Sequence, residues 1–330
     1  MLRALLSLVS VGYRLGRWGH RLAYLSGFRR RVRLSVPVVS VGNITTGGVG
    51  KTPVCAWLAR EFRRRGRVPV VLARGYGREA GETLNDEGRW LEHSVPGLTV
   101  VQDADRVSAI RPVLERGESD VVILDDGFQH ERLERDLDLV LLDATRPFGF
   151  GRLLPRGLLR DPLPALARAD LIVLTRCELC SGAELARLES EVERWAPGRP
   201  VARIVFSISR LDTSDGPRPP SDLEGRSVLL MCGVGNPRAV VRTVQALGVE
   251  SVELWPLPDH GRPSPTRWEE ARRQAAAAGQ VLVLTEKDAV KLPEGAGGAW
   301  VLVQEAEWTA GRERLDHLLG AVLGEDGRAG

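Results

Sequence analysis

The chain alternates short apolar runs with longer stretches in which apolar residues recur every three or four positions. The short runs predict buried strands and the longer stretches predict crossover helices, a combination typical of a parallel sheet. In the first two thirds of the chain the predicted strands are Val36–Val41, Val68–Leu72, Leu98–Val101, Val121–Leu124, Leu137–Leu142, Leu171–Leu174 and Val201–Val205. The predicted helices of this part cover residues 52–65, 104–116, 161–168 and 183–195.

The last third repeats the alternation on a smaller scale. Its predicted strands are Val228–Met231, Ser251–Trp255, Val281–Leu284 and Trp300–Val303, with helices near 237–247, 264–278 and 308–322. Between the two parts, residues 207–225 are rich in Ser, Asp, Pro and Gly, a composition typical of a connecting segment. The pattern therefore predicts a core domain over 34–210, a linker over 211–225 and a smaller α/β domain over 226–330.

Residues 1–33 form a separate segment, in which a helix-like apolar pattern carries arginines on one side. On a wheel of about 100° per residue the arginines fall within roughly 60°; they are Arg3, Arg14, Arg17 and Arg21. This pattern is typical of a helix lying in a membrane interface with its cations on lipid phosphates. The uncharged stretch 4–13 is too short to span a bilayer. The alternative is a helix packed on the protein's own core with its arginines in water.

Composition narrows the function classes only slightly. The net charge of +3 over 330 residues gives no sign of a nucleic-acid partner, and no obligate protein partner is expected. Only Lys51, Lys287 and Lys291 are lysines, against 43 arginines, so a lysine in a motif indicates that a compact ammonium is required there. The four cysteines include one close pair, Cys177 and Cys180, but neither a disulfide framework nor a second pair for zinc.

A glycine-rich loop follows the first predicted strand and precedes a predicted helix. Its residues are Thr46, Gly47, Gly48, Val49, Gly50, Lys51 and Thr52. This order suits a phosphate group, because the backbone N–H groups and the helix dipole favour anionic charge. Lys51 is then placed to reach the β- and γ-phosphates of a nucleoside triphosphate, and the Thr52 hydroxyl to hold Mg²⁺. The predicted fold class is therefore an α/β P-loop NTPase-like parallel-sheet domain with a second, smaller α/β domain and an N-terminal amphipathic helix.

Polar clusters follow several other predicted strands, as expected where parallel strands end at a ligand site. The run 121–124 ends in Asp125 and Asp126, and one or both carboxylates are candidates for Mg²⁺. Side chains alternate across a strand, so the choice between the two stays open. Transfer to a hydroxyl also benefits from a nearby base. Of the five histidines, His130 and His260 lie at strand ends beside carboxylates.

Together these residues resemble the tetraacyldisaccharide 4′-kinase (lipid A 4′-kinase) family. The matching strings run in order over nearly the whole chain. They are Ser40–Pro53 around the glycine loop, Arg74–Gly77, Asp86–Glu87, Asp125–His130, Phe148–Gly157, Pro258–His260 and Leu284–Lys291. The combination is specific, although each string alone is modest.

The resemblance implies an ATP- and Mg²⁺-dependent kinase that phosphorylates the 4′-hydroxyl of a lipid disaccharide 1-phosphate. It implies a site in a cleft between two α/β/α domains, at the cytoplasmic face of the bacterial inner membrane, with the N-terminal helix on anionic lipid. By motif, Asp86 matches the residue that activates the sugar hydroxyl, His260 its partner, and Lys51 the residue that neutralises the transferred phosphoryl group. The resemblance also implies supporting roles near the site; these residues are Arg74, Glu87, Gln129, His130 and Lys287.

Two other readings compete with this one. A membrane-associated partitioning ATPase also joins this loop type to an amphipathic helix, but such proteins usually carry a second lysine where this chain has Thr46. They also lack the extra domain that carries His260. The other alternative is a soluble kinase for a small metabolite, with residues 1–30 merely packed on the fold.

Overall fold

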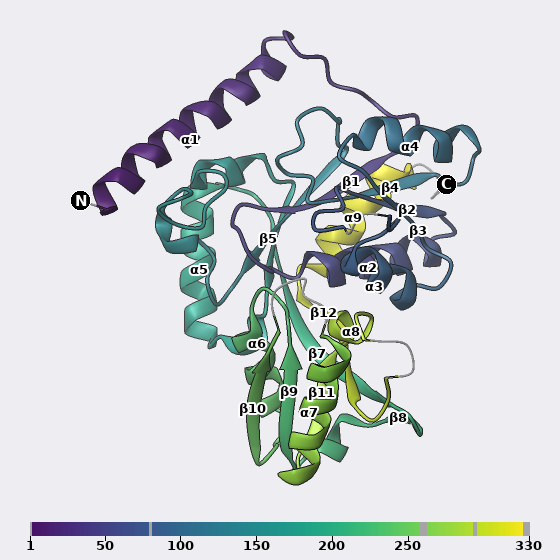
Figure 1. Cartoon of the computed structure of the whole chain (residues 1–330). Helices are drawn as coiled ribbons and strands as arrows, with labels where there is room; N and C mark the ends of the chain where they lie inside the picture. Colours follow the sequence, from purple (N-terminus) through teal and green to yellow (C-terminus); the bar gives the residue numbers. More distant parts are fainter. Residues whose placement is uncertain (1, 79–80, 258–262, 293–295, 326–330) are drawn as a thin grey trace. The chain divides into compact units, whose positions relative to one another are not determined.

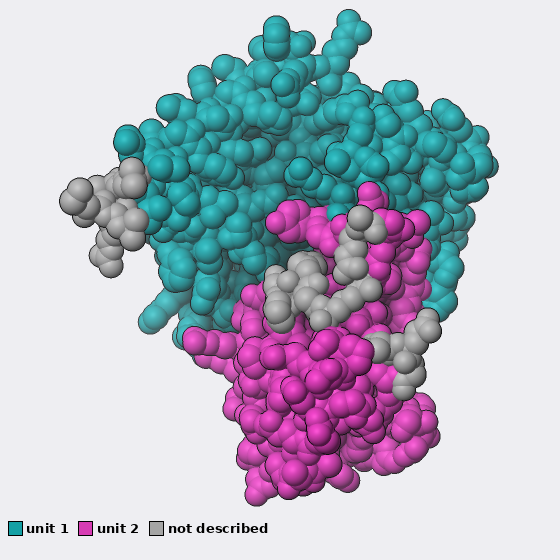
Figure 2. All heavy atoms as spheres, in the orientation of Figure 1, with its two compact units in different colours: residues 1–75, 95–205, 307–330 teal, residues 76–94, 206–306 magenta. Residues whose placement is uncertain are grey.

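The computed structural model describes residues 2–78, 81–257, 263–292 and 296–325, and it divides the chain into two compact units (Figure 2). The first unit combines residues 1–75, 95–205 and 307–330, and the second combines residues 76–94 and 206–306. These boundaries differ from the two predicted domains, 34–210 and 226–330, in two respects. Residues 76–94 belong with the smaller unit, and the C-terminal segment returns to the larger one.

The first unit is built on a parallel sheet in the order β7-β6-β5-β1-β4-β2-β3, with β12 beside β7 (Figure 1). The residues of β1, β2, β4, β5 and β6 are all buried, as in sheets covered on both faces, whereas the edge strand β3 is partly exposed. The strands are β1 Val38–Asn43, β2 Pro69–Ala73, β3 Thr99–Gln102, β4 Val121–Asp125, β5 Leu137–Asp143, β6 Leu171–Thr175, β7 Val201–Thr213 and β12 Trp300–Ala310.

Two helices of the first unit, α4 and α5, begin at a side-chain cap. The Asp105 side chain accepts a hydrogen bond from Ser108 N at the start of α4, and Ser181 and Glu184 form a capping box at the start of α5. The α-helices are α1 Leu2–Leu25, α2 Lys51–Arg64, α4 Arg106–Glu115, α5 Gly182–Trp195 and α9 Arg312–Leu323. The 3₁₀ helices are η1 Gly149–Gly151, η2 Leu163–Arg168 and η3 Cys177–Leu179.

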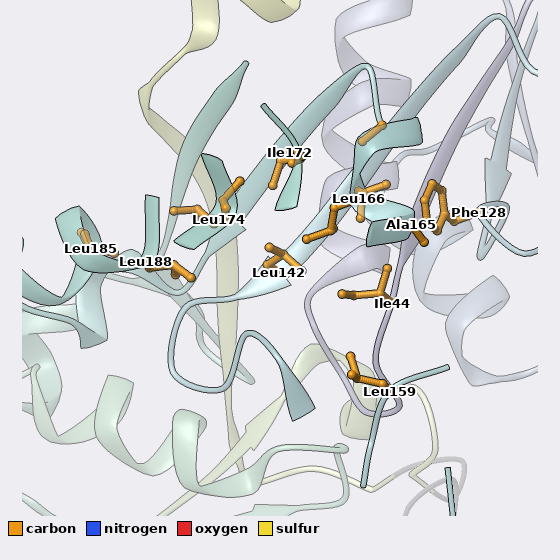
Figure 3. Packing of buried hydrophobic residues seen from close by; sticks show 14 of the residues in the cluster. Ile44, Phe128, Leu142, Leu159, Ala165, Leu166, Ile172, Leu174, Leu185 and Leu188 are labelled. Carbon is orange, nitrogen blue, oxygen red and sulfur yellow. The ribbon is translucent and has the colours of Figure 1, made fainter. Parts of the chain in front are cut away.

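One part of the core lies directly beside the glycine loop (Figure 3). Leu142 of β5 and Leu174 of β6 pack there with Ile44 and Phe128, which flank the loop and the end of β4. All four side chains are fully buried. The loop is therefore supported on the core side by close packing, which holds backbone positions tightly.

The strands of the second unit follow the order β10-β9-β11-β12, with parallel pairing along this run and β12 again beside β7 in the same 12-stranded sheet. A short strand, β8, pairs antiparallel with β7. Its remaining strands are β8 Gly216–Arg218, β9 Ser227–Cys232, β10 Ser251–Pro256 and β11 Val281–Thr285. Its helices are α3 Asp86–Ser94, η4 Pro220–Leu223, α6 Pro237–Gln245, α7 Pro265–Ala277 and α8 Glu286–Ala289.

Three predicted elements are wrong in detail. Residues 211–225 form the end of β7, the β8 hairpin and η4 rather than a linker, because Leu211 and Leu223 are fully buried in the core of the second unit. The predicted helix 161–168 is the shorter 3₁₀ helix η2, which follows Pro162. The predicted helix 308–322 begins only after β12, at Arg312.

The N-terminal helix α1, purple in Figure 1, carries exposed apolar side chains. Its exposed apolar side chains recur at helical spacing; on one face they are Leu8, Val11, Leu15, Trp18, Leu22 and Leu25. Two arginines of the predicted cationic stripe instead face the protein, because Arg17 pairs with Asp161 at 2.8 Å and Arg21 lies 4.0 Å from Glu131. Among the described residues no helix is long and apolar enough to cross a bilayer.

Candidate active site

The glycine loop lies between the C-terminal end of β1 and the N-terminus of α2, as predicted. Its last glycine, Gly50, caps α2 in the left-handed region at φ 89°, and Gly47 also has a positive φ of 112°. A residue with a Cβ would strain the loop at either position. Lys51 and Thr52 are the first two residues of α2, so their backbone N–H groups belong to the positive end of the helix dipole.

The Lys51 ammonium lies between two polar partners at the ends of neighbouring strands. Its Nζ is 3.4 Å from Asn43 Oδ1 at the end of β1 and 3.5 Å from Asp126 Oδ1 beyond β4. Arg160 donates a hydrogen bond to the same Asp126 oxygen at 2.7 Å. Burial opposes ionisation of Asp126, but the charges of Lys51 and Arg160 outweigh it and hold its pKa well below the usual range. Asp126 is therefore a carboxylate at neutral pH.

Backbone geometry separates the two adjacent aspartates. Asp125 is the buried last residue of β4, whereas Asp126 adopts a left-handed conformation with φ 52°. Gly127 must follow without a side chain, because a Cβ there would lie 2.5 Å from Ser40 Oγ and 2.8 Å from the Leu124 side chain. The sharp turn carries the Asp126 carboxylate to Lys51.

Two further segments clamp the loop. Thr46 N donates to Leu158 O at 2.7 Å, which ties the start of the loop to the segment before η2. On the other side Arg176 donates to Gly48 O at 2.7 Å while pairing with Asp143, and Thr175 Oγ1 donates to Val49 O at 2.8 Å. The bonds from Arg176 and Thr175 engage carbonyls of the loop, whereas the Thr46 bond uses the N–H of its first residue. The two carbonyl contacts are compatible with loop N–H groups binding an anion.

The donor set at this site suits Mg²⁺. Thr52, Asp125 and Asp126 offer one hydroxyl and two carboxylates, and no cluster of three or more acidic, His or Cys side chains able to hold a metal occurs among the described residues. Magnesium usually takes only one or two protein carboxylates and completes its shell with water and substrate phosphates. An all-protein cage is therefore not needed here.

Gln129 and His130 lie beside the loop, in different environments. Gln129 Nε2 donates to Asn43 O at 2.7 Å and to Asp161 Oδ2 at 3.1 Å, so it braces the end of β1. Burial and the positive charge of Arg106 lower the pKa of His130 to about 4. His130 is therefore a neutral imidazole at pH 7. Arg74 follows β2 and is exposed. Burial lowers the pKa of the Arg106 guanidinium, and the positive charge of Arg74 lowers it further.

A second polar cluster lies within the second unit, around the start of α3. Asp86 is buried, and its two oxygens lie 2.5 Å from Arg89 Nη2 and 3.8 Å from Lys291 Nζ. Lys291 is fully buried and pairs with Asp288 at 2.9 Å. Next to them, Lys287 Nζ lies 3.0 Å from Glu87 Oε1. The structure thus brings together two predicted pieces, the Asp86–Glu87 string and the Lys287–Lys291 segment.

Comparison with known proteins decides the family. The sequence model for tetraacyldisaccharide-1-P 4′-kinase (LpxK) matches residues 2–323. The chain belongs to the tetraacyldisaccharide 4′-kinase family. It is 39% identical over 309 residues to the tetraacyldisaccharide 4′-kinase of Geobacter metallireducens, covering 88% of each chain. It is 37% identical over 334 residues to that of an Anaeromyxobacter species, covering 94% of this chain and 89% of the relative.

A solved family structure also shares the fold. The crystal structure of LpxK from Aquifex aeolicus in complex with ATP superposes with a TM-score of 0.76 at 29% identity, covering 98% of this chain and 100% of that one. The predicted family and the predicted fold class, an α/β protein with a mostly parallel sheet and an N-terminal helix, are confirmed.

Within the described residues, the family motifs named here fall in two places. Those of the glycine loop, the paired aspartates and Gln129–His130 meet in the first unit, and those of Asp86 and Lys287 meet in the second. His260 lies outside the described residues. Sequence reasoning missed Arg160 and Arg176 as contacts of the site, although both lie in or beside strings already singled out.

Proposed function

We propose that this chain transfers the γ-phosphoryl group of ATP to the 4′-hydroxyl of a tetraacyldisaccharide 1-phosphate, the reaction for which its family is named. One observation carries the proposal. Lys51 stands at the start of α2 within 3.5 Å of Asp126 and 3.4 Å of Asn43, so one ammonium and one carboxylate converge on a glycine loop at a helix N-terminus. That is the arrangement a triphosphate and its metal ion require.

The residues proposed to bind the nucleotide lie in the first unit. Lys51 neutralises charge on the β- and γ-phosphates, and the loop amides bind their oxygens. Thr52, Asp125 and Asp126 would hold Mg²⁺, which when bound neutralises the developing charge of the transferred group. Arg160 forms an ion pair with Asp126, so it adds a second positive charge beside that of Lys51.

Asp86 is the residue proposed to act on the acceptor hydroxyl. Transfer to an alcohol needs a group that accepts the hydroxyl proton, and a carboxylate fixed in one orientation serves. Arg89 and Lys291 each approach one of the two Asp86 oxygens, which fixes the carboxylate plane. The assignment of Asp86 as base, with His260 as its partner, stays a prediction from the family motif.

The lipid end of the acceptor fits a pocket beside α1. The pocket has a volume of about 580 Å³ and lies within the first unit. Leu15 and Trp18 of α1 face Leu153 and Pro162 across it, and its cationic lining residues are Arg14, Arg17, Arg21 and Arg160. A mostly apolar pocket with basic side chains suits a ligand that carries both acyl chains and phosphate.

We place the enzyme at the cytoplasmic face of the bacterial inner membrane, bound peripherally through α1. The supporting observation is the solvated apolar stripe of α1, in which Leu15 is 62% and Trp18 64% exposed. Single exposed apolar residues are ordinary, but a continuous stripe along a 24-residue helix marks an interface. Arg29 and Arg30, exposed just past the helix, suit anionic lipid.

The test is transfer of labelled γ-phosphate from ATP to the disaccharide precursor in mixed micelles. We expect label in the lipid fraction, and none with an acceptor that lacks the 4′-hydroxyl. Lys51→Ala should lower kcat by about 10²-fold or more, because it removes a charge aimed at the transition state. ATP hydrolysis that proceeds equally well without acceptor would instead favour an ATPase and overturn the proposal.

A further inference from the structure

An aromatic side chain projects into solvent from a tightly built turn after β5. Phe150 is 69% exposed and adopts a left-handed backbone with φ 67°, between Gly149 at φ 51° and Gly151 at φ 64°. A bulky residue in this region of the Ramachandran map is uncommon and strained. Glycine would fit the same backbone without strain, so local conformation does not explain why phenylalanine stands here.

The turn is rigid rather than loose. Leu158 N donates to Gly149 O at 2.9 Å, and Gly151 N donates to Phe148 O at 2.7 Å. A Cβ on Gly149 would lie 2.9 Å from the Leu158 Cβ, so the two strands of the loop are in close contact. The backbone therefore holds the Phe150 ring outward, and burial in the protein's own core does not explain it either.

Positive charge surrounds the ring. The Arg146 guanidinium lies 5.1 Å from the ring centroid, and Arg152 and Arg156 are exposed on the same loop. Residues 144–160 include four arginines and no acidic residue. None of the ion pairs formed among the described residues involves Arg146, Arg152 or Arg156. An exposed aromatic ring among unneutralised arginines is complementary to an anionic surface with an apolar interior.

The loop is fastened to α1. Ser10 Oγ donates to Leu153 O at 3.1 Å, and Arg156 N donates to Ser10 Oγ at 3.4 Å. Ser10 lies on α1 between Leu8, which is 70% exposed, and Leu15, so the loop adjoins the N-terminal half of the exposed apolar stripe. Anything that covers the stripe there comes close to the loop.

We infer that residues 146–157 form a second membrane contact, in which Phe150 inserts among the headgroups of an anionic phospholipid bilayer while Arg146, Arg152 and Arg156 bind lipid phosphates. Aromatic rings and arginines both favour this interfacial zone. The inference rests on the proposed docking of α1, and it adds a rigid second point of attachment. Two points define an orientation on the surface, which one helix alone leaves free to roll.

The experiment follows an environment-sensitive fluorophore on the full-length protein. Cys180 is first replaced by serine, because the other cysteines are buried, and the label is attached at Phe150→Cys. Vesicles contain phosphatidylcholine and phosphatidylglycerol but no acceptor lipid. We expect a blue shift on binding, quenching by spin-labelled lipid, and a much smaller response with neutral vesicles.

Two labelled controls separate this inference from the proposed docking. Val68→Cys, at the opposite end of the strands and 56% exposed, should show no change. Leu15→Cys on α1 should respond as Phe150→Cys does. A response at Leu15 with none at Phe150 would overturn the second contact and leave the helix docking intact. No response at either position would overturn both.

Phe150→Gly gives an independent test without a label. Because glycine suits φ 67°, this variant should melt at the same temperature as the wild type or higher. Its partition onto anionic vesicles should nevertheless fall about tenfold, and Phe150→Trp should restore it. A Phe150→Gly variant that binds vesicles as well as the wild type would contradict the inference.

Discussion

At the residue scale, two buried charged side chains of the second unit, Asp86 and Lys291, lie 3.8 Å apart. Asp86 is 5% exposed, and its position between Arg89 and Lys291 leaves the carboxylate little rotational freedom. A base held this way requires no reorientation before it accepts a proton. Fixed positioning of this kind lowers the activation barrier, because the loss of freedom occurs on folding and not during the reaction. The same contacts also tie α3 to the segment after β11.

Asp86→Asn tests the base directly. Asparagine keeps the size of the side chain and one oxygen for Arg89, but it cannot accept the hydroxyl proton. We expect kcat to fall by about 10²–10⁴-fold, the range for loss of a general base, with little change in the KM for ATP. Steady-state kinetics with the lipid acceptor measure both quantities, and an unchanged kcat would remove Asp86 from the role.

The buried ion pair between Lys291 and Asp288 leads to a prediction about the stability of the fold. Both side chains have 0% exposure, and Asp288 also accepts hydrogen bonds from Gly233 N and Thr285 Oγ1. Lys291→Met would leave a buried carboxylate without its counter-charge, so we expect a loss of about 3–5 kcal/mol in the free energy of unfolding.

Its matched control is the double variant Lys291→Met with Asp288→Asn, which removes both charges and keeps hydrogen-bonding groups at position 288. Urea denaturation should show that the double variant is less destabilised than Lys291→Met alone. If the two variants unfold at the same urea concentration, the pair is not the source of the effect.

At the element scale, α2 is held by the C-terminal helix α9. Glu61 of α2 contacts Arg65 at 2.7 Å on its own helix and Arg312 of α9 at 3.1 Å, and Arg65 in turn contacts Asp316 at 2.6 Å. The helix that starts with Lys51 and Thr52 is therefore braced by a segment more than 240 residues later in the chain. This contact also explains why residues 307–330 belong to the first unit.

The Glu61 cluster predicts a pH dependence of stability. Burial opposes its ionisation, but hydrogen bonds from Arg64 and Arg65 lower its pKa from 4.5 to about 2. The stabilisation is therefore complete above about pH 4.5 and is lost as the pH falls from there toward 2. Glu61→Gln should cost about 1–2 kcal/mol at pH 7, allowing for screening at the partly solvated helix surface. Thermal melts should show this difference shrinking below pH 4.5.

The elements beside the nucleotide loop could be predicted from sequence, and α3 could not. β1 and β4 are mostly apolar and are followed by recognisable polar motifs, so the sequence predicts each within two residues. The nine residues of α3 include Gly88 and four charged side chains in the first seven, without a clear helical period. Its start depends on Asn85, whose side chain accepts from Gly88 N, a cap that is visible only once the chain is folded.

Arginine contacts were the least predictable part of the site. Arg160 and Arg176 are two of 43 arginines, and nothing in their local sequence identifies which one returns to Asp126 or to Gly48. The same limit applies to α1, where the wheel placed Arg17 toward lipid although its partner Asp161 lies 144 residues away. Long-range ion pairs have no periodic signature, unlike helix and strand faces.

At the scale of the whole molecule, one segment of the first unit joins the glycine loop to α1, the helix proposed to face lipid. Tyr13 of α1 donates to Arg160 O at 3.1 Å, and the Arg160 side chain reaches Asp126 at 2.7 Å. Arg17 of α1 holds the next residue, Asp161, which also accepts from Gln129. A kinase whose acceptor is embedded in a membrane needs its phosphate site at a fixed height above the bilayer, and this chain of contacts provides a fixed connection.

Replacing the exposed stripe should therefore separate membrane access from chemistry. In Leu8→Asn with Leu25→Asn, both side chains are already solvated and neither lines the pocket beside α1, so we expect the fold to be retained while the apparent KM for vesicle-embedded acceptor rises about tenfold or more. The kcat and KM for ATP with a detergent-dispersed acceptor should stay near wild type, because neither residue contacts Lys51 or Asp126.

Arg17→Gln provides the contrasting variant, since it breaks a contact to Asp161, whose side chain is only 6% exposed, without touching the apolar stripe. We expect α1 to become more susceptible to limited proteolysis and kcat to fall with either form of the acceptor, because the loss is transmitted through Asp161 to Gln129 and the end of β1. A different outcome would contradict this prediction: Arg17→Gln weakens vesicle binding but leaves turnover in detergent intact. Arg17 would then act at the lipid surface, and the contacts from α1 to the nucleotide loop would have no effect on turnover.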